Sequence, residues 1–224
     1  MNNIPYYVYF TFLVTLFATI YIFFRATSQS KLFVVIISAW IFIQTILGYF
    51  GFYSDSLSKF PKVQFILLPQ IIFILIKFIT PNGKKFIGSL NLKTLSFLHI
   101  VRLPVEIVLY WLFVFKTVPE SMTFEGRNLD VFSGLTAPII YYFGFVKNKL
   151  PKLVIICWNF LCLCLLVNII VIGMLSTPTP FQQFGFEQPN IAVLHFPFMF
   201  LPACIVPLVL FSHLASIKQL IYHD

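Results

Sequence analysis

Charged residues are scarce in this chain. They make up 10% of its 224 residues, whereas a soluble globular domain usually carries about 25%. Apolar runs recur along the chain, and several reach the roughly 20 residues that a helix needs to cross a bilayer. The runs are apolar at consecutive positions, which favours helices over the strands of a membrane barrel. The composition therefore excludes an ordinary soluble domain and predicts a multi-pass protein embedded in a lipid bilayer.

Cysteines and catalytic motifs are also few. All four cysteines fall within apolar runs, which indicates packing residues and not a disulfide or metal framework. The sequence has no paired-histidine zinc motif, no Gly-x-Ser-x-Gly turn and no phosphate-binding glycine loop. An intramembrane enzyme, which can take its groups from several helices, is therefore the less favoured hypothesis.

We predict an all-α fold, a single integral membrane domain over residues 1–224 with seven membrane-spanning helices. Three prolines in the last span, at 197, 202 and 207, predict that this helix is interrupted. The expected spans are residues 5–24, 32–50, 63–80, 95–115, 128–146, 153–176 and 191–214.

The net charge of +8 is carried mostly by the short connections between spans. This distribution indicates membrane topology and not nucleic-acid binding, because basic loops stay in the cytoplasm. The count places the N-terminus outside and the C-terminus in the cytoplasm. The nine basic residues of the inner side are Arg25, Lys31, Lys84, Lys85, Lys93, Lys147, Lys149, Lys152 and Lys218, and the four of the outer side are Lys59, Lys62, Lys116 and Arg127.

A polar stripe runs along the fourth predicted span. At 100° per residue, four side chains share one face of this helix: His99, Arg102, Glu106 and Tyr110. Glu106 is expected near the middle of the bilayer, where an ionised carboxylate without a partner is costly. Arg102, one turn away, is the expected partner of Glu106. Tyr110 is expected to donate a hydrogen bond to Glu106 from the other side. Pro104 is expected to open the helix locally.

Two hypotheses account for the stripe. In the first, it binds or moves a small polar solute or a proton, because an ionisable residue inside a membrane is a functional candidate. In the second, it forms a structural ion pair that fixes the packing of helices.

His99 and His213 are expected at similar depth on different helices, which leaves open a haem or metal site. Histidines of this kind are more often core residues, so no cofactor is predicted.

Two connections on the predicted outer side are rich in polar and aromatic residues. They run over residues 118–130 and 176–190, and they predict a gate for a ligand. The alternative is a docking surface for a partner membrane protein, which would make the chain a non-catalytic subunit or an assembly factor. The residues that we single out in or near them are Glu125, Arg127, Asp130, Phe184, Glu187 and His195.

Two families of seven-helix proteins are not supported. A retinal protein needs a lysine in the middle of its last helix, whereas Lys218 lies beyond the last predicted span. Small sugar transporters carry Pro-Gln pairs, but the pair Pro69-Gln70 has no counterpart in the second half of the chain.

Three segments carry a resemblance of another kind. They read LPVEIVLY, MTFEGRNLDVFSGLTAP and STPTPFQQFGFEQPNIAVLHFPF, and they lie in the second half of the chain. These segments resemble an uncharacterised group of small multi-helix bacterial membrane proteins. The resemblance implies a location in the bacterial inner (cytoplasmic) membrane, and it implies no activity.

Overall fold

The computed structural model describes residues 4–54 and 62–222, and all its regular elements in these ranges are helices. The all-α prediction is confirmed. Lys59, which belongs to the predicted outer side, lies outside the described residues. The α-helices are α1 (Tyr6–Ala26), α2 (Lys31–Tyr49), α3 (Gln64–Ile79), α4 (Pro81–Gly88), α5 (Leu92–Leu98), α6 (Arg102–Val114), α7 (Val131–Ile139), α8 (Lys152–Ser176) and α9 (Val206–Tyr222). The shorter helical segments are η1 (His99–Val101), η2 (Glu120–Met122), η3 (Ile140–Val146), η4 (Ala192–Leu194) and η5 (Leu201–Ile205).

Several helices have the length and apolarity that a membrane requires. Five segments qualify by themselves: α1, α2, α8 and the continuous segments Leu92–Val114 and Leu201–Tyr222. The pair α3 and α4 qualifies together, although the two helices meet at an angle of 90°. The segment Val131–Val146 is apolar but shorter. These lengths agree with a membrane protein.

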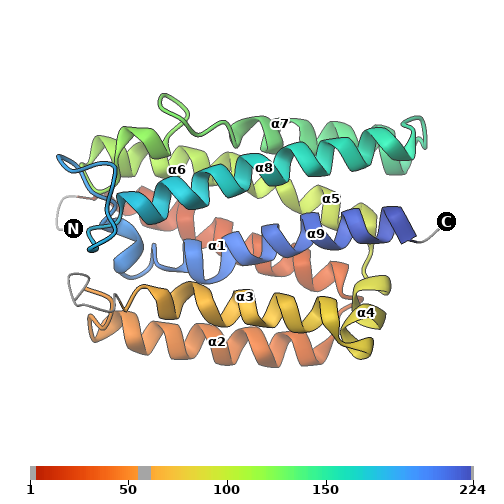
Figure 1. The fold of residues 1–224 in the computed structure, drawn as a ribbon, viewed down its shortest axis with the longest axis horizontal. Helices are drawn as coiled ribbons and strands as arrows, with labels where there is room; N and C mark the ends of the chain where they lie inside the picture. The colour runs from red at the N-terminus through yellow and green to blue at the C-terminus, as the bar shows by residue number, and fades with distance from the viewer. Residues whose placement is uncertain (1–3, 55–61, 223–224) are drawn as a thin grey trace.

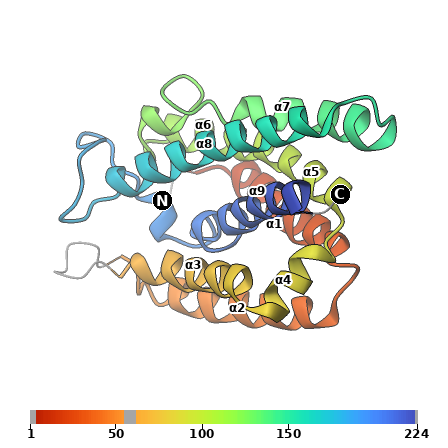
Figure 2. The ribbon, with the colours of Figure 1, turned by 45° about the vertical axis from the view of Figure 1, so that its right-hand side comes forward.

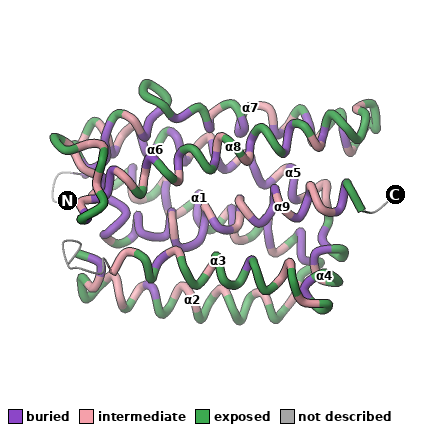
Figure 3. Tube along the Cα trace, viewed as in Figure 1, coloured by how far each residue is buried: buried purple, intermediate pink, exposed green. Residues whose placement is uncertain are grey.

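The helices are arranged in layers (Figures 1 and 2). α2 and α3 form one layer, α1 and α9 lie in the middle, and α6, α7 and α8 form the layer on the other side. The middle layer is the most buried (Figure 3), whereas α2 contributes a single buried side chain, Gln44. Large apolar side chains cover the exposed faces of α2 and α3, as expected of helices that contact lipid. The two termini lie at opposite ends of the bundle (Figure 1).

The last helix begins later than the sequence indicated. The helix was expected from residue 191 to 214, but it starts at Leu201 and continues to Tyr222. Pro202 lies in its first turn, where the missing N–H of a proline costs little. The first five residues of the helix form the π-helical segment η5, which continues without a break into α9. The prolines at 202 and 207 thus leave a change of helical type and no gap within this helix. His195 consequently lies before the helix and not within it.

Pro207 has a second consequence, because it cannot donate to the carbonyl of Ala203 four residues earlier. The Ala203 oxygen instead accepts hydrogen bonds from Trp40 Nε1 and Gln70 Nε2, both at 2.8 Å. Trp40 belongs to α2 and Gln70 to α3, so these two bonds attach the α2–α3 layer to the middle layer of the bundle.

These two bonds should be energetically coupled. We expect Gln70→Leu to lower the free energy of unfolding by no more than about 1.5 kcal/mol, because the Ala203 carbonyl keeps one donor. The double variant Trp40→Phe, Gln70→Leu should cost more than the sum of the single variants, since the carbonyl then loses both side-chain donors. Chemical unfolding in detergent measures all three, and strict additivity would contradict the coupling.

Candidate functional site

The predicted polar stripe points into the bundle. α5, η1 and α6 form one continuous apolar segment, Leu92–Val114, in which the 3₁₀ turn η1 comes shortly before Pro104. His99, Arg102 and Glu106 are 0%, 3% and 2% exposed. Tyr110 is only half-buried, and its ring stacks on Phe124 with 5.0 Å between centroids. No hydrogen bond joins the Tyr110 hydroxyl to Glu106 in the described part of the chain.

Arg102 pairs with a residue other than the expected Glu106. Its Nη2 lies 3.2 Å from Asp130 Oδ2, and this is a buried ion pair. Both terminal nitrogens also donate to the Cys162 carbonyl of α8 at 3.3 Å, and Nη1 lies 3.4 Å from His213 Nε2 of α9. Arg102 therefore connects α6, α8, α9 and the start of α7.

Glu106 is held by Asn128, which lies two residues before Asp130 in the connection between α6 and α7. Asn128 Nδ2 donates to Glu106 Oε1 at 2.6 Å and to the Met122 carbonyl at 3.0 Å. Asn128 Oδ1 accepts from the backbone N–H of Asp130 at 3.1 Å. The connection after α6 thus turns inward before α7 begins. We name Arg102, Glu106, Asn128 and Asp130 the Arg102 cluster.

The Arg102 cluster contains one guanidinium and two carboxyl groups. Glu106 Oε2 and Asp130 Oδ1 are buried and have no hydrogen-bond partner among the described residues. Arg102 Nε is in the same situation. A second buried carboxylate without a counter-charge is costly, so the cluster can take up a proton or a cationic group.

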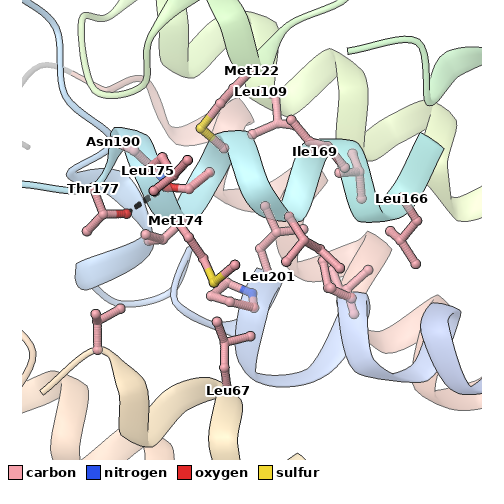
Figure 4. Close-up of a pocket in the computed structure, with 18 of the residues that line it drawn as sticks. Leu67, Leu109, Met122, Leu166, Ile169, Met174, Leu175, Thr177, Asn190 and Leu201 are labelled. Atoms are coloured by element: carbon pink, nitrogen blue, oxygen red, sulfur yellow. Dashed lines mark hydrogen bonds between the residues drawn. The ribbon is translucent and has the colours of Figure 1, made fainter. Parts of the chain in front are cut away.

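A cavity of about 310 Å³ adjoins the Arg102 cluster. Figure 4 shows its apolar lining, to which α3, α6, α8 and η5 contribute side chains. Among its lining residues, only Arg102, Glu106 and Asp130 are ionisable. Thr177 and Asn190, from the connection after α8, add polar atoms at one end of the cavity. Asn190 Nδ2 donates to Thr177 Oγ1 at 3.4 Å. The cavity therefore combines apolar walls with one charged patch.

The two inner histidines form a stacked pair. The rings of His99 and His213 are 3.7 Å apart and nearly parallel, at 12°. His213 Nδ1 contacts Asn159 Oδ1 at 3.0 Å, while neither ring nitrogen of His99 has a partner among the described residues. Parallel rings in contact leave no room for an iron between their nitrogens. This geometry does not favour a haem between the two histidines, and that no cofactor is bound stays a prediction.

The remaining predicted outer residues lie apart from the Arg102 cluster. Glu125, Arg127 and Glu187 are exposed, and Phe184 and His195 are half-buried. The guanidinium carbon of Arg127 lies 5.9 Å from the centre of the Phe184 ring, so the two outer connections touch. Whether they gate a ligand or dock a partner protein stays a prediction.

Sequence reasoning missed Asn128. It also expected Asp130 in or near a connection on the outer side, whereas this residue is 4% exposed and lies against Arg102. The available signal was the short spacing of Asn128 and Asp130 at the start of an apolar run. That spacing lets one turn of chain present both side chains in the same direction.

Fold and site together define an all-α protein with several membrane-length helices and a buried polar cluster on an apolar cavity. Residues 60–221 match the model of a protein family described as Domain of unknown function (DUF8737), and the chain belongs to this family. The predicted relation to an uncharacterised group is thereby confirmed. No curated protein and no solved structure matches the chain significantly.

Proposed function

We propose that this protein binds, within the membrane, a small molecule that has an apolar body and a cationic or proton-donating group. The observation that carries the proposal concerns two buried carboxyl oxygens, Glu106 Oε2 and Asp130 Oδ1. They have no hydrogen-bond partner among the described residues, and their side chains line a mainly apolar cavity. Ligand cavities typically measure about 300–1,000 Å³, and this one, at about 310 Å³, lies at the lower end of that range.

The lining of the cavity narrows the chemistry of the ligand. A fully polar solute such as a sugar would leave most of its hydroxyl groups against apolar walls without hydrogen bonds. An amine with a short alkyl chain matches both the charged patch and the apolar walls of the cavity. Its ammonium group pairs with the carboxylates, and its chain contacts the walls. A proton alone can occupy the same carboxylates, so proton and amine compete.

Movement of the ligand or proton across the membrane is part of the proposal. Its support is the π-helical segment η5, which lines the cavity at the point where the last helix begins. Transporters commonly bind their substrates where a helix begins or ends at membrane depth.

We propose seven passes through a bacterial inner membrane, with the N-terminus outside. The five long segments, the bent pair α3–α4 and the shorter segment Val131–Val146 make up these passes. The positions of the two termini at opposite ends (Figure 1) and the excess of lysine and arginine at the C-terminal end support this orientation.

The proposed binding is tested with octylamine on the purified protein in nanodiscs. We expect octylamine to raise the melting temperature and octanoate not to, because only the amine supplies a positive charge. Its affinity should fall as the pH falls, since protons compete for Glu106 and Asp130 beside Arg102. Glu106→Gln should weaken octylamine binding by at least about tenfold and remove most of the pH dependence.

Glu120→Gln is the matched control, because it removes an exposed carboxylate outside the cavity. It should bind octylamine as the unchanged protein does. If Glu106→Gln is folded and keeps both the affinity and its pH dependence, Glu106 has a structural role and the proposed function is wrong.

A further inference from the structure

A second cavity, of about 270 Å³, lies between α2, α3 and the η5–α9 segment. Most side chains that line it are apolar or aromatic. Its polar side chains include Ser30 and Lys77 near one end and Trp40 and Gln70 near the middle of the bundle. No member of the Arg102 cluster lines it, so the two cavities are separate sites.

The second cavity is as deep as one leaflet of a bilayer. Ser30 caps the start of α2 by accepting a hydrogen bond from the Phe33 N–H, and Trp40 lies ten residues after it. Ten residues of helix rise about 15 Å, which is half of the roughly 30 Å hydrocarbon core. The cavity therefore extends from the end of the bundle that holds the C-terminus toward its middle (Figure 1).

Lys77 places a positive charge near the end of this cavity that lies at the C-terminal end of the bundle. Its Nζ lies 5.2 Å from the ring centre of Phe73 and 5.0 Å from that of Phe86. These two rings hold the half-buried ammonium group beside the cavity. Other lysines at the same end of the bundle include Lys31, Lys84, Lys85 and Lys218.

No described carboxylate lies near these lysines. Glu106 and Asp130 belong to the Arg102 cluster, and the other described acidic residues lie in the connections at the opposite end (Figure 1): Glu120, Glu125 and Glu187. Lys77 forms no ion pair with any described residue. The lysine-rich end therefore carries a positive charge that the described part of the chain does not neutralise.

We propose that the second cavity binds an anionic phospholipid, with an acyl chain between α2 and α9 and its phosphate against Lys77. Charge complementarity favours an anionic headgroup, because basic residues at a membrane surface attract anionic lipids. The depth of the cavity matches an acyl chain within one leaflet. α2 covers the cavity loosely, since only Gln44 of this helix is buried, so a lipid can enter from the side.

Native mass spectrometry of the detergent-purified protein tests this proposal. We expect phosphatidylglycerol to bind in preference to phosphatidylcholine, and glycerol phosphate without acyl chains not to bind. Lys77→Gln should lower phosphatidylglycerol affinity by about fivefold, and Lys77→Arg should restore it. Ile37→Trp, which fills the cavity without changing the charge, should also lower the affinity.

Lys93→Gln is the matched control. Lys93 lies at the same end of the bundle with its Nζ 5.2 Å over the Tyr141 ring, but it does not line the cavity. Equal loss of phosphatidylglycerol in Lys77→Gln and Lys93→Gln would show diffuse charge attraction and overturn the proposal. Unchanged binding in a folded Ile37→Trp variant, or equal binding of glycerol phosphate, would overturn it as well. Since Lys77 is outside the first cavity, this test is independent of octylamine binding.

Discussion

Replacing Arg102 by methionine is expected to lower the free energy of unfolding by about 3–5 kcal/mol. Arg102 is the ion-pair partner of buried Asp130 and also donates to the Cys162 carbonyl. Methionine has a similar length but no charge, so it leaves the Asp130 carboxylate buried without a counter-charge. Chemical unfolding in detergent, followed by circular dichroism, measures the loss.

Two further variants identify the cause of this loss. Arg25→Met removes an exposed arginine whose side chain donates a hydrogen bond to the Tyr21 hydroxyl and to no other described residue. It should change stability by less than about 1 kcal/mol. The double variant Arg102→Met, Asp130→Leu removes both charges of the ion pair and should recover much of the stability. If Arg102→Met is no less stable than Arg25→Met, the Arg102–Asp130 pair does not hold the bundle together.

Gly126→Ala is expected to abolish octylamine binding by displacing the segment that carries Asn128. A Cβ atom at position 126 would lie 2.3 Å from the Glu120 carbonyl oxygen and 2.7 Å from the Ser121 Cα. Both are backbone atoms, so the segment itself must move. Asn128, two residues further on, would then lose its 2.6 Å hydrogen bond to Glu106.

Gly126→Ala should also cost about 1–3 kcal/mol of stability, as other overpacked positions do. Octylamine titration and chemical unfolding of the same preparation measure both effects. Gly144→Ala is its control, because the nearest atom there is the end of the Ile155 side chain at 3.1 Å, which can rotate. Normal octylamine binding by Gly126→Ala would show that this segment does not position the site.

The sequence predicted most helices close to their observed ends. α8 (Lys152–Ser176), for example, covers the expected span 153–176 within a residue, because the length and apolarity of a run decide whether a helix can cross a bilayer. The beginning of the last helix was less predictable. The segment from 191 to 200 is apolar enough for a span, yet prolines and tertiary contacts keep it out of the long helix.

The sequence by itself also determined which face of the segment Leu92–Val114 is buried, because helical periodicity sets the relative directions of His99, Arg102 and Glu106. Only the tertiary structure decided their partners. Asp130 and Asn128 come from a connection whose inward turn depends on backbone hydrogen bonds and on the close approach at Gly126. Periodicity carries information along one helix, whereas an ion pair between elements depends on how the chain folds back, and that is a property of the whole bundle.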